Sequence, residues 1–216
     1  MVHYARRKDF DTQWKTKGKP AGMAHAVPAH IKVGSMALRN RLAMQGNGVY
    51  FVTTTVVDFL NVFNDAKCCE LLIKNILYYQ QRYEFTIIAY VIMPSHFHWI
   101  TSIDINKGSI SDIMRDIKKY SAWDIFEHLK NNNSKYLQNF YKAANPGNGQ
   151  KMKFWMKRFD DEVIKNKEML LSRISYIHNN PIKAGLVERP EEYAYSSARN
   201  YYGLSSLINV DISFIT

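Results

Sequence analysis

Residues 91–100 of the chain read VIMPSHFHWI, an apolar run interrupted by two histidines. Alternate residues of a β-strand point to the same face of a sheet, so His96 and His98 share one face and Phe97 and Trp99 share the other. The pattern predicts a strand that buries its aromatic side chains against helices and projects both imidazoles together. We expect Pro94 at the start of this strand, where a missing backbone N–H costs least.

The segments on either side of this run predict an α+β fold. The run VYFVTTTVVDF is β-branched and aromatic, and residues 85–90 have the same character, so two further strands are expected. Apolar residues recur at helical spacing after Asp65, a candidate N-cap, and again after Gly108. The order strand, helix, strand, strand, helix indicates an antiparallel sheet with helices packed on it.

The charge balance points to an anionic partner. The 216 residues include 29 Lys and Arg against 19 Asp and Glu, which gives a formal net charge of +10. Nucleic acid is the leading candidate partner for such a surplus, and the rival interpretation is a basic surface with no partner. No apolar run approaches the roughly 20 residues that span a bilayer, so no membrane partner is expected. The two adjacent cysteines and the lack of an apolar signal segment predict a cytoplasmic, nucleoid-associated protein.

Composition divides the chain into three parts. Residues 1–47 are basic, contain glycines and prolines, and show little periodicity. We expect them to form a basic N-terminal arm that contacts DNA through Arg6 and Arg7, although a solvated tail fits the same composition. Residues 48–202 are expected to form the folded domain, and residues 203–216 a C-terminal tail.

A second basic segment, KMKFWMKRF, interleaves cations with aromatic residues. This pattern suits neutralisation of a DNA backbone together with stacking of bases on aromatic rings. The alternative is a basic loop whose aromatic residues anchor it to the core. The DNA contacts expected in this segment are Lys151, Lys153, Trp155, Lys157 and Arg158.

The two histidines also suggest a metal. Neighbouring imidazoles on one strand face can hold a single divalent ion through their ring nitrogens, although surface histidines without an ion give the same pattern. Two protein ligands are fewer than the four of a structural zinc site. A metal held here would therefore have open positions for a third ligand and for substrate.

A later helix, expected over about residues 167–179, carries a candidate nucleophile. Its predicted buried stripe consists of Leu170, Ile174 and Ile177. Tyr176 lies away from this stripe, and Asn180 lies one turn further along on the same side as Tyr176. The helix is expected to end before Pro181, because proline disfavours helical geometry in the preceding residue.

Four segments, MPSHFHW, FWMKRFDDEVI, YIHNNPIKAGLV and EYAYSSARNYY, occur in this order. Together they resemble the single-tyrosine transposase family, in particular its branch associated with repetitive extragenic palindromes (REP). That family belongs to the HUH nucleases, named for two histidines that flank a hydrophobic residue, as His96 and His98 flank Phe97. The resemblance covers roughly residues 49–202. It implies a ferredoxin-like sheet with the histidines on a central strand and a nucleophilic tyrosine on a later helix.

The resemblance also implies roles for individual residues. The tyrosine of the YIxxNPxxxGL pattern is Tyr176, and the metal-binding amide that the family places one turn later is Asn180. A competing nucleophile, Tyr120 in DIKKYSAW, lies at the margin of its helix's apolar stripe and does not match the motif. The family's chemistry implies Mg²⁺ or Mn²⁺ held by His96, His98 and Asn180, a single-stranded or hairpin DNA substrate, and a 5′-phosphotyrosine intermediate.

Two other functions remain open at this point. One is a nucleic-acid-binding module of the same fold that does not cleave. The other is a metal-dependent hydrolase that uses an activated water and forms no covalent link to DNA. The residues do not distinguish a monomer from a homodimer.

Overall fold

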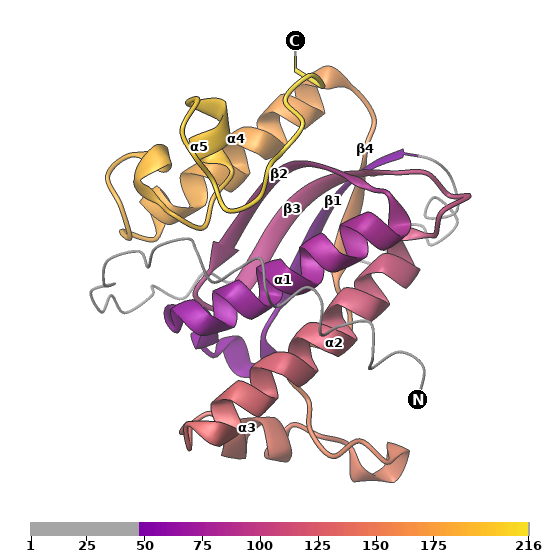
Figure 1. Ribbon diagram of the computed structural model, residues 1–216, viewed down its shortest axis with the longest axis vertical. Helices are drawn as coiled ribbons and strands as arrows, with labels where there is room; N and C mark the ends of the chain where they lie inside the picture. Colours follow the sequence, from indigo (N-terminus) through magenta and orange to yellow (C-terminus); the bar gives the residue numbers. More distant parts are fainter. Residues whose placement is uncertain (1–47, 216) are drawn as a thin grey trace.

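The computed structural model describes residues 48–215, so the predicted basic arm, with Arg6 and Arg7, lies outside the described residues. The elements of the sheet and the helices between its strands are, in chain order, β1 (Gly48–Thr55), α1 (Ala66–Tyr83), β2 (Thr86–Met93), β3 (His96–Ile103), α2 (Ile110–Asn131) and β4 (Asp160–Ile164). A short helix, α3 (Leu137–Lys142), precedes β4, and α4 (Lys167–Lys183) and α5 (Ala198–Tyr201) follow it. Figure 1 shows their arrangement.

The four strands form one sheet in the order β2-β3-β1-β4. Each neighbouring pair is antiparallel. This strand order and the succession β-α-β-β-α-β are those of the ferredoxin-like split βαβ motif. The predicted α+β class and antiparallel sheet are therefore confirmed, with β1 and β3 as the two central strands.

Both predicted sheet-packing helices are present, and the cap expected at Asp65 is confirmed. The side chain of Asp65 accepts a hydrogen bond from the backbone N–H of Lys67 at the start of α1. Ser109 and Asp112 form a reciprocal capping box at the start of α2. Such caps satisfy backbone donors that have no partner inside the helix. No helix among the described residues is long and apolar enough to cross a membrane.

The helices cover the two faces of the sheet differently. α1 and α2 lie side by side over one face in Figure 1. Phe97 of β3 is on this side, because its ring packs against Trp155, which donates a hydrogen bond to Ser121 of α2, and strand alternation puts Trp99 on the same face. α4 contacts β2 and β3 on the opposite face, where Tyr176 of α4 meets His98 of β3. The imidazoles therefore lie on the side of α4, away from the pair formed by α1 and α2.

The expectation of one strand over the run VIMPSHFHWI is wrong. Its first three residues end β2, Pro94 and Ser95 form the turn, and His96 begins β3. A proline lacks the N–H that a strand ladder requires and has a fixed φ, so a tight turn suits it better than a strand interior. The hairpin that results pairs Met93 with His96 and Val91 with His98.

The expected end of α4 before Pro181 is also wrong. The helix continues through Pro181 to Lys183, and Gly185 follows with a left-handed φ of 68°. Pro181 is buried in the helix's apolar stripe, so packing offsets the local preference that proline imposes on its predecessor. As a result Asn180 keeps helical geometry, one turn after Tyr176.

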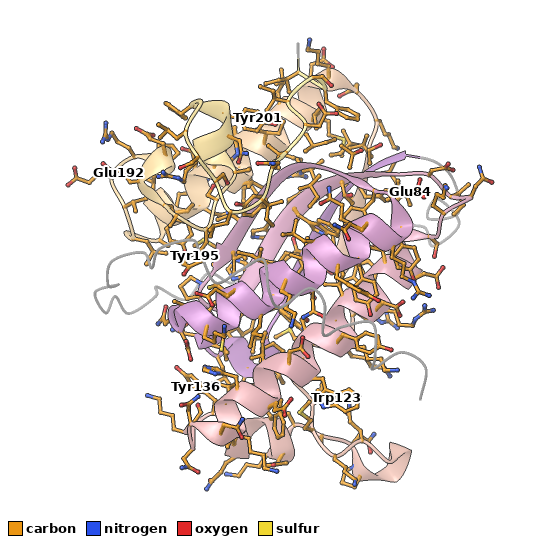
Figure 2. All side chains as sticks on the ribbon, in the orientation of Figure 1. Glu84, Trp123, Tyr136, Glu192, Tyr195 and Tyr201 are labelled. Carbon is orange, nitrogen blue, oxygen red and sulfur yellow. The ribbon has the colours of Figure 1, made fainter. Side chains whose placement is uncertain are left out.

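The segment that follows α4 lies along the outer edge of β2. Its backbone hydrogen bonds reach three residues of the strand, from Ser197 N to Tyr90 O, from Ile92 N to Tyr195 O and from Asp211 N to Ile87 O, each 2.9 Å long. Tyr195 and Tyr201 mark this segment in Figure 2. Part of the expected C-terminal tail is therefore packed, with Ile208 1% exposed. An edge strand covered in this way cannot pair with another chain.

Candidate active site

The two histidines of β3 lie next to each other on the α4 side of the sheet. The register pairs Thr55 with His96 and Thr53 with His98 across β1 and β3. The centroids of the two imidazole rings are 4.8 Å apart. Phe97 and Trp99, one residue out of phase, are each 1% exposed on the other face. The predicted division of the strand into an imidazole face and an aromatic face is confirmed.

A threonine of the neighbouring strand orients His98. Thr53 Oγ1 lies 2.7 Å from His98 Nδ1. The other ring nitrogen, Nε2, is buried and has no hydrogen-bond partner among the described residues. If Nδ1–H donates to the hydroxyl, the lone pair of Nε2 is free to bind a metal, which is the arrangement that supports metal-binding histidines in proteins. A buried polar atom without a partner is costly, and a ligand bound at Nε2 would remove that cost.

Both imidazoles are held in their neutral form. Burial lowers the pKa of His96 to about 4. Burial, and then the proximity of His96, lower the pKa of His98 well below its usual value. Each ring therefore becomes charged only well below neutral pH. A neutral imidazole is the form that binds metal ions.

Tyr176 comes to the histidines from α4. Its ring contacts the ring of His98 edge-on with a centroid distance of 5.3 Å, and the side chain is 36% exposed. Phe51 contacts both rings, stacked on His98 at 5.6 Å and edge-on to Tyr176 at 6.0 Å. The phenol is thus placed beside the imidazole pair while it stays accessible to a substrate.

Tyr120, the competing candidate, lies elsewhere. It belongs to α2, on the far side of the sheet from α4, and its ring packs against that of Tyr79 at 5.8 Å. The structure therefore brings Tyr176, and not Tyr120, to the histidine pair.

Asn180 is one turn beyond Tyr176 on α4. Its side-chain nitrogen is buried and has no hydrogen-bond partner among the described residues. This NH₂ group is a hydrogen-bond donor and does not bind a cation, so a metal held here would bind the amide oxygen of Asn180. Two neutral imidazoles and an amide, with further positions open, are a donor set that fits a divalent cation.

Three residues of the site were missed by sequence reasoning. Thr53 and Phe51 contact His98 from β1. The third residue is Lys183, and its Nζ lies 5.6 Å from the centroid of the Tyr176 ring. The alternation in FVTTT and the two-turn spacing from Tyr176 to Lys183 were the signals that could have identified them. Arg173 of α4 forms an ion pair with Glu162 of β4 at 2.6 Å, which fastens the helix across the sheet.

The basic segment before β4 is partly exposed. Lys151, Lys157 and Arg158 are exposed and Lys153 is half-buried. Trp155 differs, because it is 5% exposed and its ring packs against Phe63, Phe97 and Phe154. Its Nε1–H also donates to Ser121 Oγ at 3.3 Å. The expected stacking of a base on Trp155 is therefore contradicted, since the indole anchors the segment to the core.

Comparison with known proteins places this chain in a family. A family model described as "Transposase IS200 like" matches residues 59–180, more than half of the chain. The chain belongs to the IS200-like transposase family. The matched region contains His96, His98, Tyr176 and Asn180.

Individual relatives identify the branch of this family. A putative REP-associated tyrosine transposase of Haemophilus influenzae is 24% identical over 160 residues, covering 69% of this chain and 79% of the relative. The REP-associated tyrosine transposase of Escherichia coli is 27% identical over 116 residues, covering 52% of this chain and 54% of that relative, so the match spans about half of each protein. These relatives confirm the resemblance to the REP-associated branch. Together with the family match, their names show that this chain is a transposase.

A solved structure supports the fold. It is described as a REP-associated tyrosine transposase bound to a REP hairpin, and it superposes with a TM-score of 0.58 at 21% sequence identity. The match covers 82% of this chain and 94% of the solved one. The antiparallel sheet with its packed helices is therefore shared with that protein.

Proposed function

We propose that this transposase cleaves single-stranded DNA next to a hairpin and becomes linked to the DNA through Tyr176. The observation that carries the proposal is the unpartnered Nε2 of His98 beside the accessible ring of Tyr176. The hairpin bound to the solved relative supports a hairpin as the substrate. A chromosomal hairpin substrate would also make the protein nucleoid-associated.

In this mechanism His96, His98 and Asn180 would hold Mg²⁺ or Mn²⁺. Such an ion, when bound, withdraws charge from the oxygens of the scissile phosphate. Tyr176 Oη attacks the phosphorus, the bond from phosphorus to the 3′ oxygen breaks, and the phenol proton passes to solvent. The leaving oxygen takes up a proton as a free 3′-OH. The phosphotyrosine conserves the phosphodiester link, so a second 3′-OH can later reverse the step.

Other residues of the site would support this chemistry. Thr53 holds the His98 ring by its Nδ1, and Phe51 packs against both His98 and Tyr176. The Lys183 ammonium beside the Tyr176 ring provides positive charge where the anionic phosphate must approach.

DNA affinity would come mainly from phosphate contacts. The exposed cations Lys151, Lys157 and Arg158, with the half-buried Lys153, are the proposed contacts within the described residues. Arg6 and Arg7 are proposed contacts outside them. Each phosphate neutralised releases counterions, so binding should weaken as salt rises.

A covalent-adduct assay tests the proposal. Full-length protein is incubated with Mn²⁺ and a hairpin that has a labelled single-stranded flank, and the products are separated on a denaturing gel. We expect a labelled protein band that disappears in EDTA and in Tyr176→Phe but remains in Tyr120→Phe. Tyr120→Phe is the matched control, because both substitutions remove one hydroxyl and keep the ring.

The other outcomes distinguish the rival functions. A free 5′-phosphate product with no protein attached would identify a hydrolase that uses water. Hairpin binding with no product at any Mn²⁺ or Mg²⁺ concentration would identify a binding module. An adduct that persists in Tyr176→Phe and is lost in Tyr120→Phe would overturn the assignment of the nucleophile.

A further inference from the structure

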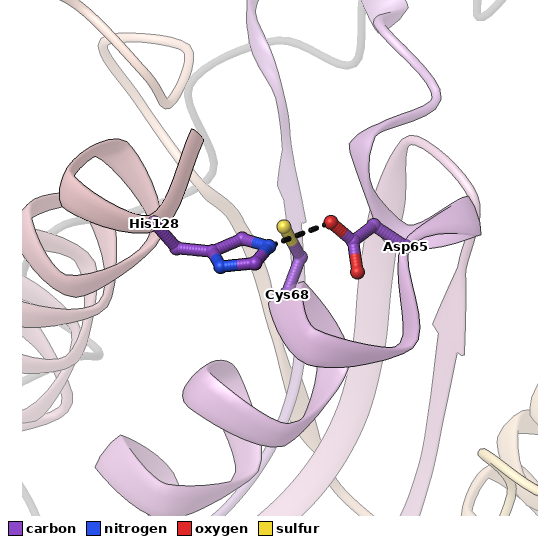
Figure 3. A group of neighbouring side chains, drawn as sticks. All are labelled: Asp65, Cys68 and His128. Atoms are coloured by element: carbon purple, nitrogen blue, oxygen red, sulfur yellow. Dashed lines mark hydrogen bonds and ion pairs between the residues drawn. The ribbon is translucent and has the colours of Figure 1, made fainter. Parts of the chain in front are cut away.

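A second group of ligand-bearing side chains lies where α1 begins and α2 ends, on the side of the sheet away from α4 (Figure 3). Asp65 caps α1, Cys68 lies in its first turn, and His128 lies in the last turn of α2. One potential ligand atom from each residue lies within 4.8 Å of the other two. A carboxylate oxygen, a sulfur and an imidazole nitrogen therefore converge from two helices.

The three groups contact one another directly. His128 Nε2 lies 2.7 Å from Asp65 Oδ2, and the Cys68 thiol is hydrogen-bonded to the Asp65 side chain. Figure 3 shows the sulfur beside the line that joins His128 to Asp65. The second carboxylate oxygen, Oδ1, accepts from Lys67 N and so caps the helix. Capping thus uses one oxygen of Asp65 and leaves the other directed at the sulfur and the imidazole.

The adjacent cysteine, Cys69, is also buried but does not contact Asp65 and His128 in the way that Cys68 does. Cys69 is as fully buried as Cys68, but its sulfur donates to the backbone oxygen of Phe63 at 3.2 Å. Cys68 instead faces two other metal-ligating side chains. The two neighbouring cysteines form a natural pair for a controlled experiment.

We propose that Asp65, Cys68 and His128 form a zinc site that fastens the start of α1 to the end of α2. Sulfur, imidazole nitrogen and carboxylate oxygen are the ligands that Zn²⁺ takes in proteins, usually with four in a tetrahedron. The side chains of His128 and Asp65 are 23% and 43% exposed, so water can reach the fourth position. A thiolate ligand favours zinc over Mg²⁺ and Mn²⁺, which distinguishes this site from the one on β3.

Zinc binding requires small and balanced changes. With bond lengths of about 2.0–2.3 Å, tetrahedral ligand atoms lie roughly 3.3–3.6 Å apart. His128 Nε2 must therefore retreat slightly from its 2.7 Å contact with Asp65. Cys68 loses its proton to solvent as the zinc–sulfur bond forms. The proton on His128 passes from Nε2 to Nδ1, and Asn132 Nδ2, which lies 3.2 Å from Nδ1 and is itself a donor, must then move away from it.

The position suggests a structural role. Residues 56–64 connect β1 to the start of α1 and are fastened to the hairpin turn before His96 by hydrogen bonds from Val56 N to Ser95 O and from Phe63 N to Pro94 O. An ion that joins α1 to α2 would therefore stabilise the packed side of the sheet without contacting DNA. We expect zinc to raise the melting temperature without taking part in cleavage.

The test uses full-length protein in which His96→Ala and His98→Ala remove the imidazoles on β3, so that a metal bound there cannot be mistaken for this one. Co²⁺, a spectroscopic substitute for Zn²⁺, is added to metal-free protein. We expect the near-ultraviolet charge-transfer band of a cobalt–thiolate bond and, after exchange, one zinc per chain. Zinc should raise the melting temperature, and Mg²⁺ should leave it unchanged.

Matched variants decide whether the proposed ligands are responsible. Cys68→Ser should abolish the cobalt–thiolate band and Cys69→Ser should retain it. His128 is half-buried, so His128→Gln should leave the protein folded. This substitution should weaken zinc binding at least 100-fold. Absence of the band, an equal loss in Cys69→Ser, or the same thermal shift with Mg²⁺ would overturn the proposal. Adduct formation by the protein with intact β3 histidines is measured separately, so failure of the zinc site leaves the proposed cleavage unaffected.

Discussion

The two faces of β3 differ in the kind of polar atom that they bury. On the side of α1 and α2, Phe97 and Trp99 are buried in aromatic packing, and Trp99 Nε1, which can only donate a hydrogen bond, has no partner among the described residues. On the side of α4, the buried His98 Nε2 also has no partner there, but an imidazole nitrogen can bind a metal ion. The packed face holds the strand in one position, and the opposite face can then keep a polar atom ready for a ligand. Precise placement of reactive groups depends on such support from rigid elements.

On β1, two neighbouring threonines, Thr53 and Thr54, point to the two different faces of the sheet. Thr53 faces α4 and contacts His98, whereas Thr54 is 1% exposed on the packed face. The Thr54 hydroxyl has no hydrogen-bond partner in the described part of the chain. Neighbouring threonines therefore have different tasks because strand geometry turns them to opposite sides. Paired substitutions across the two faces test this difference directly.

The largest effects are expected for His98→Ala and Trp99→Ala. His98→Ala should reduce adduct formation by more than the roughly 10–100-fold that loss of a group supporting a metal ligand causes. It should leave hairpin binding nearly unchanged, and it should lower the melting temperature less than Trp99→Ala does, because the imidazole is smaller than the indole. Trp99→Ala should lower the free energy of unfolding by about 3–5 kcal/mol, because it opens a cavity in the packed face. Denaturant unfolding and the adduct assay check both. Similar losses of stability in the two variants would contradict the proposal that Trp99 stabilises the fold and His98 serves the reaction.

The next pair is Thr53→Val and Thr54→Val. Thr53→Val removes the hydroxyl that orients His98, so Mn²⁺-dependent adduct formation should fall by about 10–100-fold. Thr54→Val removes an unpartnered buried hydroxyl, so the protein should be as stable as the parent or slightly more stable. Initial rates measured against Mn²⁺ concentration, with thermal unfolding of both variants, make the comparison. Equal activity of the two variants would show that Thr53 does not position the imidazole.

A milder effect is expected for Asn180→Ala. An amide is a neutral ligand that water can replace, so adduct formation should fall by about tenfold, equivalent to about 1.4 kcal/mol. Excess Mn²⁺ should restore part of the rate. Asn179→Ala is the control, because the Asn179 amide bonds only within its own helix, to Ser175, among the described residues. If Asn179→Ala were the more damaging change, Asn180 would not be the third ligand.

The smallest effect is expected for the double substitution of Lys157 and Arg158 by Ala. Loss of phosphate contacts should weaken hairpin binding and reduce its salt dependence by a slope of about 0.7 per contact on single-stranded DNA. Adduct formation at saturating DNA should not change, because neither side chain contacts the proposed site. Affinities measured from low to high salt check this. Parallel salt dependences of variant and parent would mean that these residues do not touch DNA.

Local chemistry made much of the fold predictable. The alternation of histidines and aromatic residues identified the two faces of β3, and Asp65 marked the start of α1. These signals are readable because they depend on residues a few positions apart. The motif around Tyr176 likewise identified the helix that the structure places against His98.

The tertiary structure decided what depends on distant partners. It extended α4 through Pro181, because the proline packs in a buried stripe, and it buried Trp155, which sequence reasoning had assigned to DNA. It also brought Thr53 into contact with His98, 45 positions away in the sequence, and His128 into contact with Asp65, 63 positions away. Periodicity shows which way a side chain points within its own element. Only the packing of elements against one another determines which side chain it meets.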